Sequence, residues 1–304
     1  MSLKENIFVF TDVDLDGTTS LLALHWHLGA QLGDIPFKAT TVSNFRREFL
    51  KWAENDSINN YDKVYFLDLD TSNCIDLVDH NKSIIIDHHL THVKVKENYK
   101  QAKFHIIEAT SCAKLVYSYF KINVTNAQKY FIALANDYDS YQFKLPETYD
   151  LNCLYSNTQK TLEKSRTHKF IERFYNGFDS FTSQEKNIIK EHKTNRDNVI
   201  NNLQIYAGNV SLGKVPYRVV GTMCSKFVNE VCDYLLKEHK ADIVFSINPN
   251  NQHVSWRKNK ETCPIDLSKL SAKLCDGGGH EYAAGGKMTE TFMEFTKQLT
   301  PLNG

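Results

Sequence analysis

Three aspartates follow an apolar run near the beginning of the sequence. The stretch FTDVDLDGTTS, residues 10–20, places Asp12, Asp14 and Asp16 within five residues. Carboxylates this close together cannot all stay ionised unless cations neutralise them or protons bind to them. Divalent metal ions do this at neutral pH, and a solvated turn with helix N-capping is the plainer alternative for the same residues. The motifs described next favour the metal site.

Two later apolar runs also end in potential metal ligands. Asp68 follows KVYFL, and Asp87-His88-His89 follows SIII. Ligands of an open parallel sheet bind outside the carboxyl ends of its strands, so we expect these side chains to meet the three aspartates in one crevice. Carboxylate and imidazole without cysteine suit Mn²⁺ or Mg²⁺ better than structural zinc. The many acidic ligands indicate two ions about 3.5 to 4 Å apart, sharing a carboxylate and a bridging water.

The elements that must position these residues alternate between short β-rich runs and helical patterns, as in βαβ units. The expected fold class is α/β and bilobed, with an N-terminal mostly parallel sheet flanked by helices, a connecting helix and a smaller α/β C-terminal domain. The expected domains are 1–182, 183–203 for the connecting helix, and 204–304. Expected strands are 7–11, 38–42, 63–67, 83–86, 205–212, 217–220, 243–247 and 253–257, and expected helices include 20–28 and 129–135.

Composition excludes several classes of protein. The 304 residues carry 36 Lys and Arg against 36 Asp and Glu, so the basic footprint of a protein that binds long duplexes is missing. The seven cysteines are scattered and never spaced Cys-x-x-Cys, which argues against a disulfide framework and favours a reducing cytosol. No apolar run approaches the roughly 18 residues of a spanning helix, and the first residues do not form a signal peptide. We therefore expect a cytoplasmic protein without a membrane partner.

The motifs resemble those of the DHH phosphoesterases with a DHH-associated C-terminal domain. The resemblance rests on FTDVDLDGTTS, on FLDLDTS around Asp68, on Asp87-His88-His89, and on GGGHEYAAG at 277–285, in the family's order and across nearly the whole chain. The chain is similar to the oligoribonuclease branch and, through its DxDxDG motif, to the RecJ-type exonucleases. This resemblance implies two lobes and a site for two divalent ions in the larger lobe, with Mn²⁺ as the expected ion and Mg²⁺ or Co²⁺ as alternatives.

The resemblance also implies ligands in the first motif. Asp14 and Asp16 match metal ligands of the family, and Asp12 is expected to be a third. Many oligoribonuclease members have a histidine where this chain has Phe10, so Asp12 is expected to substitute for it as in the RecJ-type motif.

Further roles follow from the later motifs. By the resemblance, Asp68 is the carboxylate shared between the metals, His88 is a metal ligand, and His89 contacts the substrate phosphate, which makes these three the expected catalytic residues. In the last acidic motif Asp139 fits the family pattern better than Asp137, which is kept as the alternative ligand.

The second domain is expected to bind the substrate. Glycines let backbone amides approach a phosphate closely, and a histidine adds a donor that can carry charge. Arg257 in VSWRKN is expected to make a bidentate phosphate contact. For Trp256 two interpretations remain, a stacking face for a base or half-buried packing. The glycine loop consists of Gly277, Gly278, Gly279 and His280.

Three functions are compatible with these residues. The leading one is a metal-dependent exonuclease or oligoribonuclease that hydrolyses short RNA or single-stranded DNA to nucleoside monophosphates by attack of a metal-activated water. The second is a phosphatase or phosphodiesterase of a small nucleotide, such as a bisphosphorylated adenosine or a linear or cyclic dinucleotide. The third is a catalytically silent nucleotide-binding regulator. A short oligonucleotide or small nucleotide is thus the expected partner, and a long duplex is not.

Overall fold

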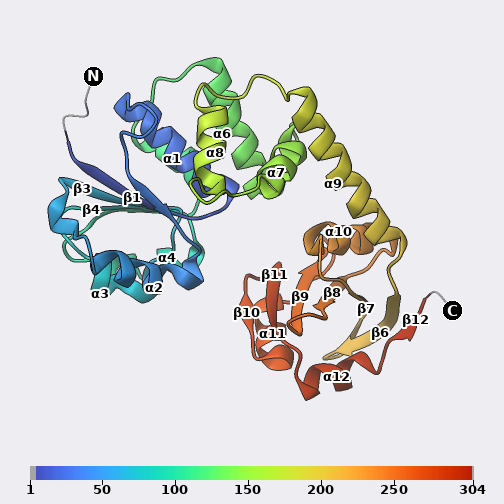
Figure 1. Ribbon diagram of the computed structural model, residues 1–304. Helices are drawn as coiled ribbons and strands as arrows, with labels where there is room; N and C mark the ends of the chain where they lie inside the picture. Colours follow the sequence, from blue (N-terminus) through green and yellow to red (C-terminus); the bar gives the residue numbers. More distant parts are fainter. Residues whose placement is uncertain (1–4, 303–304) are drawn as a thin grey trace. The chain divides into compact units, whose positions relative to one another are not determined.

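The computed structural model describes residues 5–302 (Figure 1). The chain divides into two compact units, one ending at Ile189 and the other beginning at Lys190. This division lies within α9 (Ser183–Asn201), the helix that the sequence predicts at 183–203. Each unit has its own sheet and its own apolar core.

The N-terminal unit is built on a five-stranded parallel sheet in the order β2-β1-β3-β4-β5. The strand β1 is buried on both faces, as the uninterrupted apolar run IFVFT indicates. Ile7 and Val9 of the first strand pack into one core, and Phe8 and Phe10 pack into the core on the other face. The strands are β1 (Ile7–Thr11), β2 (Phe37–Ala39), β3 (Lys63–Leu67), β4 (Ser83–Asp87) and β5 (Lys103–Ile106).

Helices cover both faces of this sheet. In Figure 1, α2, α3 and α4 lie on one face, and α1 and α6 lie on the other. The α-helices are α1 (Leu15–Leu28), α2 (Val42–Ala53), α3 (Ile75–Val78), α4 (Leu90–Val93), α5 (Cys112–Tyr119), α6 (Asn126–Asp139), α7 (Thr148–Asn157) and α8 (Arg166–Phe174). The short 3-10 helices are η1 (Ile58–Asn60), η2 (Ser72–Cys74) and η3 (Lys96–Asn98).

The predicted strand at 38–42 is wrong in its extent. The strand ends at Ala39, and Val42 already begins α2, because Thr41 adopts an extended backbone as the residue before the helix. The first helix also begins earlier than predicted, at Leu15 instead of Ser20, so that the first acidic motif overlaps its first turn.

The second unit contains a seven-stranded sheet in the order β10-β11-β9-β8-β7-β6-β12. Among the described strands of this second sheet, β7 and β8 are the only parallel pair, and the other neighbours pair antiparallel. Three helices follow α9 in the described part of this unit. The predicted mixed α/β class with a second sheet domain is confirmed. The elements are β6 (Ile205–Leu212), β7 (Val215–Met223), α10 (Val228–Glu238), β8 (Ile243–Asn248), β9 (His253–Lys258), α11 (Leu267–Cys275), β10 (Gly278–Gly279), β11 (Ala283–Lys287), α12 (Glu290–Thr296) and β12 (Thr300–Pro301).

Two further features of the described residues concern the states of the cysteines and the hydropathy of the helices. All seven cysteines are free and buried. Within residues 5–302, none of the helices combines the length and the apolar character that crossing a membrane would require.

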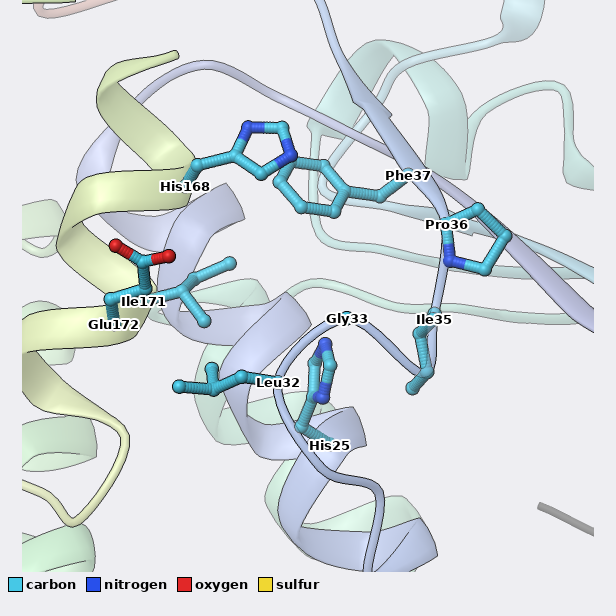
Figure 2. Close-up of a pocket in the computed structure, with 9 residues that line it drawn as sticks. All are labelled: His25, Leu32, Gly33, Ile35, Pro36, Phe37, His168, Ile171 and Glu172. Atoms are coloured by element: carbon cyan, nitrogen blue, oxygen red, sulfur yellow. The ribbon is translucent and has the colours of Figure 1, made fainter. Parts of the chain in front are cut away.

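A buried histidine of α1 lines a cavity together with residues of β2 and α8. His25 lines a cavity of about 270 Å³ together with residues that include Phe37 and His168 (Figure 2). The His25 side chain belongs to a residue only 2% exposed, and its Nδ1 atom has no hydrogen-bond partner. Burial lowers the pKa of His25 to about 4, so the imidazole is neutral in the folded protein at neutral pH.

This burial makes the folded state sensitive to acid. Because the unfolded chain takes up a proton near pH 6.5 and the folded chain only near 4, stability is lost as the pH falls between these values. Between about pH 7 and pH 5 the free energy of unfolding should fall in the parent by roughly 2 kcal/mol more than in the His25→Leu variant. Urea denaturation at both pH values measures this, with the exposed His253→Gln variant as control. Equal pH slopes in parent and His25→Leu would contradict it.

Candidate metal centre

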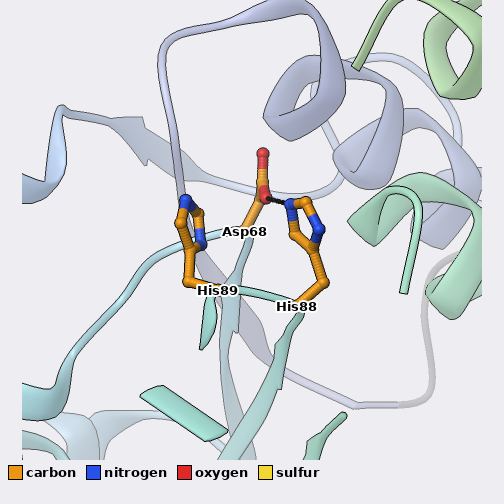
Figure 3. A group of neighbouring side chains, drawn as sticks. All are labelled: Asp68, His88 and His89. Carbon is orange, nitrogen blue, oxygen red and sulfur yellow. Dashed lines mark ion pairs between the residues drawn. The ribbon is translucent and has the colours of Figure 1, made fainter. Parts of the chain in front are cut away.

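Three carboxylates surround one imidazole nitrogen at the carboxyl end of the parallel sheet. His88 Nε2 lies 3.2 Å from Asp68 Oδ1, 3.5 Å from Asp139 Oδ2 and 3.7 Å from Asp16 Oδ2. Asp68 follows β3, and His88 and His89 follow β4, with their rings on either side of the Asp68 carboxylate (Figure 3). Two sets of potential ligands can be recognised, and within each set the ligand atoms lie within 4.8 Å of one another. One set is Asp68, His88 and His89, and the other is Asp16, His88 and Asp139.

The ring of His88 is oriented as a metal ligand would be. Its Nδ1 atom lies 3.2 Å from the backbone oxygen of Ala109, and this contact assigns the proton of a neutral ring to Nδ1. Burial, reinforced by the positive charge of His89, lowers the pKa of His88 and favours the neutral ring. The lone pair of Nε2 then faces three carboxylates. Such an arrangement is repulsive unless cations or protons lie between these groups.

The pKa values of the carboxyl groups show the same electrostatic repulsion. Burial and repulsion between the acids raise the pKa of both Asp16 and Asp68 well above the usual value. For Asp12 and Asp139, burial and the charge of Asp14 raise the pKa to about 7. Asp68 Oδ1 is buried and accepts no hydrogen bond despite its proximity to His88. A buried carboxylate oxygen without a hydrogen bond, among carboxyl groups whose pKa values are raised, fits a site for divalent cations.

The first motif divides its three aspartates between different positions. Asp14 is exposed and caps α1, because its Oδ1 accepts a hydrogen bond of 2.8 Å from the Gly17 amide. Asp16 is buried, and its carboxylate accepts hydrogen bonds from the amides of Cys112 and Ala113 at the start of α5. Asp12 accepts from the adjacent Val13 amide. Asp12 and Asp14 belong to neither of the two ligand sets, although the charge of Asp14 contributes to the raised pKa values.

The backbone at Asp68 adopts a conformation that aspartate tolerates but rarely uses. Its φ angle is 57°, in the left-handed region, directly after the extended residues of β3. This turn directs the carboxylate toward the neighbouring strand end instead of continuing the strand. Outliers of this kind concentrate at functional sites, where the surrounding packing holds them.

The two candidate aspartates of α6 point to different surroundings. Positions two apart on a helix differ by about 200° around its axis. Asp139 joins Asp16 and His88, whereas the Asp137 carboxylate accepts hydrogen bonds from the loop that follows the helix. The structure therefore does not bring Asp137 into the cluster. Its donors are Lys144 N at 3.1 Å, Leu145 N at 2.9 Å and Thr148 Oγ1 at 2.6 Å.

The close approach of the Asp12 backbone explains why the first motif contains a glycine at position 17. A Cβ atom at Gly17 would lie 2.5 Å from Asp12 O and 2.9 Å from Asp12 N, closer than real contacts. Gly17→Ala should push the Asp12 backbone away and cost about 1–3 kcal/mol of stability, as overpacking does. It should also reduce the increase in melting temperature that Mn²⁺ produces.

Thermal unfolding with and without Mn²⁺ measures both effects. Gly278→Ala is the matched control for stability, because a Cβ there meets no atom within 4 Å. A Gly17→Ala protein with the stability and Mn²⁺ response of the parent would show that the close approach is not required.

The predicted substrate-binding residues of the second unit lie on neighbouring strands. Arg257 is on β9, paired in register with Ala283 of β11, and its guanidinium donates to Asn229 Oδ1 at 2.6 Å. The glycine loop forms β10 and the turn into β11, where the His280 amide donates to Ala283 O. Residues of the loop are Gly277, Gly278, Gly279 and His280.

The alternative of a stacking face at Trp256 is wrong. The side chain is fully buried in the core of the second unit, against Phe245, Phe292 and Phe295. Side chains alternate between the two faces of a strand, so Trp256 points into the core while its neighbour Arg257 is only partly buried.

Sequence reasoning missed the partners that orient these groups. Asp87 was noted only as part of a motif, yet it is fully buried and accepts hydrogen bonds from His89 and His92. The two amides that bind Asp16 are 96 and 97 residues away along the chain. The only local signal was the polar run Asp87–His92 itself, because the remaining contacts form between distant segments.

Comparison with known proteins agrees with this geometry. Residues 6–146 match the family model described as DHH family, N-terminal domain. This part of the chain belongs to the DHH family. No curated protein matches the chain. With the family match, the carboxylate and imidazole cluster indicates a metal-dependent phosphoesterase.

Solved structures share the fold at low sequence identity. The DHH domain of a member of the s1p family of ribosomal proteins is 15% identical, with a TM-score of 0.61 over 96% of this chain and 86% of that chain. The pGpG-specific phosphodiesterase PggH from Vibrio cholerae is 14% identical, with a TM-score of 0.60 over 96% of each chain. CDC45 from Entamoeba histolytica is 10% identical, with a TM-score of 0.53 over 97% of this chain and 94% of that chain.

Proposed function

We propose that this DHH protein hydrolyses short oligonucleotides, RNA or single-stranded DNA, to nucleoside monophosphates with the help of two divalent metal ions. The observation that carries the proposal is the position of His88 Nε2, 3.2 to 3.7 Å from the carboxylate oxygens of Asp68, Asp139 and Asp16. When bound, such ions lower the pKa of a water and neutralise charge on the phosphoryl oxygens, with Mn²⁺ as the proposed ion and Mg²⁺ or Co²⁺ as alternatives.

Different residues of the first unit are proposed to bind the metal ions. Asp16, Asp68, His88 and Asp139 are the proposed metal ligands. His88 belongs to both ligand sets, and Asp68 is proposed as the carboxylate that the two metals share. Asp12 and Asp14 are proposed to complete the site from the exposed side of the first motif, where Asp14 is already held in place as the cap of α1. The raised pKa values of the buried acids mean that their protons must leave before the cations bind.

His89 is the proposed contact for the substrate phosphate. Burial acts to lower its pKa, but the hydrogen bond to Asp87 outweighs burial and raises the pKa to about 9. The ring therefore carries a positive charge at neutral pH in the metal-free protein. A partly exposed cation beside the metal site suits a phosphoryl oxygen, because charge-assisted hydrogen bonds to phosphate are short and strong.

The second unit is proposed to bind phosphate groups of a short substrate. Arg257 presents a guanidinium already oriented by Asn229, and the glycine loop with His280 offers backbone amides to a phosphate. A zero net charge agrees with a substrate of few phosphates, because few cations are needed to bind it. A phosphodiesterase specific for pGpG shares this fold, which supports a substrate of this size for the present chain.

The test compares substrate length with Mn²⁺ present. Labelled RNA and DNA from dinucleotides to about twenty nucleotides are incubated with the protein, and product lengths are followed in time. The expected result is fastest conversion of the shortest species to mononucleotides, with no activity in His88→Ala. The control is Asp76→Asn, which changes only an exposed ion pair with Arg46. If every oligonucleotide survives while a small nucleotide is hydrolysed, the alternative of a small-nucleotide phosphatase replaces the proposal, and binding without hydrolysis would indicate a regulator.

A further inference from the structure

A chain of buried hydrogen bonds lies behind His89. It begins at Thr71, after β3, and passes through Tyr99 and His92 to Asp87 at the end of β4. Each link measures 2.7 Å: Thr71 Oγ1 to Tyr99 Oη, Tyr99 Oη to His92 Nε2, His92 Nδ1 to Asp87 Oδ2, and Asp87 Oδ1 to His89 Nδ1.

These polar groups are almost completely removed from water. Thr71, Asp87 and His92 are 0% exposed, and Tyr99 is 5% exposed and packs in the apolar core that contains Phe104. Polar atoms in such surroundings cost free energy unless each is hydrogen-bonded. The four residues satisfy one another, and the one alternative contact, Thr71 Oγ1 to His92 Nε2, is long at 3.4 Å. The loss of a short link therefore leaves a buried polar atom with a weaker partner or with none.

The chain determines which atom of His89 is available to a ligand. An ionised carboxylate only accepts hydrogen bonds, so both histidines must present Nδ1–H to Asp87. The proton of His89 at Nδ1 is thereby assigned by its partner, and Nε2 is left to face the site. Asp70 does not compete for His92, because its Oδ1 lies 4.0 Å from His92 Nδ1 and accepts instead from the Ser72 amide.

We propose that Tyr99 and His92 are positioning residues for His89, acting through Asp87. This proposal rests on the proposed function for the role of His89, but the hydrogen-bond geometry stands apart from it. His92 is the only described partner of Asp87 Oδ2. Without His92 held by Tyr99, the carboxylate loses the contact that fixes its rotation, and the ring of His89 loses its fixed orientation.

The first variants remove single atoms from the chain. Tyr99→Phe deletes only the hydroxyl, and Thr71→Val deletes the hydroxyl at the far end while Thr71→Ser retains it. Tyr99→Phe and Thr71→Val should lower kcat/KM for a short oligonucleotide about tenfold, and Thr71→Ser should restore it. Tyr61→Phe is the matched control, because Tyr61 also donates from a partly buried hydroxyl, to Asp56, outside this chain.

A double-mutant cycle separates positioning from a general loss of structure. If Tyr99 acts through His89, Tyr99→Phe should have no further effect on kcat/KM in a His89→Ala protein. Equal losses in both backgrounds would overturn the proposal, as would full activity of Tyr99→Phe.

A second measurement does not depend on catalysis. Nitrogen-15 NMR of the histidine rings should show Nδ1 of His89 protonated in the parent, and a mixture of ring states in Tyr99→Phe and in His92→Gln. Ring signals of His89 that are identical in the parent and both variants would overturn the proposal. If the parent hydrolyses no nucleotide, the proposed function fails, and the NMR result alone decides whether the chain positions His89.

Discussion

Replacing Asp68 by Asn is expected to abolish hydrolysis and, in the metal-free protein, to raise the melting temperature. Asp68 Oδ1 is buried without a hydrogen bond, and burial together with Asp16 and Asp14 raises the pKa of this carboxyl. A neutral amide removes that repulsion, and Asn tolerates the left-handed backbone of this position well. Loss of the central ligand should lower kcat/KM by roughly 10³-fold, since metal ions supply several kcal/mol of transition-state stabilisation.

The two readouts must move in opposite directions for the electrostatic explanation to hold. Each kcal/mol gained should raise the melting temperature of a protein this large by about 2–4 °C, measured in a chelator. Added Mn²⁺ should then stabilise the parent more than the variant, because only the parent offers the full ligand set. A variant that is both inactive and less stable in chelator would mean that the carboxylate has a structural role instead.

In the whole cluster, the arrangement that would bind metal ions lowers the stability of the metal-free fold. Asp16 is fully buried and is held by two backbone amides, which favour its charged form, yet burial and the neighbouring acids outweigh them. A fold selected only for stability would place apolar groups here, because buried charges without partners are costly. The cluster is therefore best explained by cations that bind to the folded chain and offset this cost.

Local sequence signals predicted the strands that position the site. The apolar runs that form β1, β3 and β4 are unambiguous because a parallel strand covered by helices on both faces shows no alternation. The predicted strand at 38–42 was wrong in its extent because β2 has only three residues and lies at the edge of the sheet. For Asp14, a role as helix cap and a role beside the metal cluster are compatible, because Asp14 caps α1 where the first motif adjoins the cluster.

Contacts between distant segments were beyond prediction. Tyr99 and Thr71 lie 28 residues apart in sequence, and nothing in their surroundings in the chain marks them as partners of the DHH motif. The amides that hold Asp16 belong to the start of α5, which a sequence pattern can place as a helix but not beside the first motif. Such partners depend on tertiary packing, so their identity requires the folded structure.

The second large effect concerns the two aspartates at the end of α6. Asp139→Asn should weaken Mn²⁺ binding strongly and stabilise the metal-free protein at neutral pH, whereas Asp137→Asn should leave Mn²⁺ binding intact and destabilise the protein. For Asp137, burial acts to raise the pKa, but hydrogen bonds from Leu145, Thr148 and Lys144 outweigh it and lower the pKa. Asn replaces one acceptor oxygen by a donor, so a buried amide loses its partner at a cost of about 1–3 kcal/mol.

The stability changes caused by Asp139→Asn and Asp137→Asn have opposite signs, and each depends on pH. The pKa of Asp139 is raised to about 7 in the fold, so its ionised form costs stability as the pH rises from the unfolded value of 3.8 through 7. The gain in Asp139→Asn should therefore be largest above about pH 7 and vanish toward about pH 4. Asp137 stabilises the fold above its unfolded value, so the loss in Asp137→Asn should shrink as the pH falls below about 4.

Melting curves in chelator and in Mn²⁺, each taken across this pH range, distinguish the two positions. Because metal binding must displace the proton of Asp139, Mn²⁺ affinity of the parent should increase with pH up to about 7 and depend less on pH in Asp139→Asn. Calorimetry in buffers of different ionisation enthalpy counts the released protons directly. If Asp137→Asn abolished the Mn²⁺ response and Asp139→Asn retained it, Asp137 would be the ligand, and the hydrogen bonds to the loop after α6 would have to open when the metal binds.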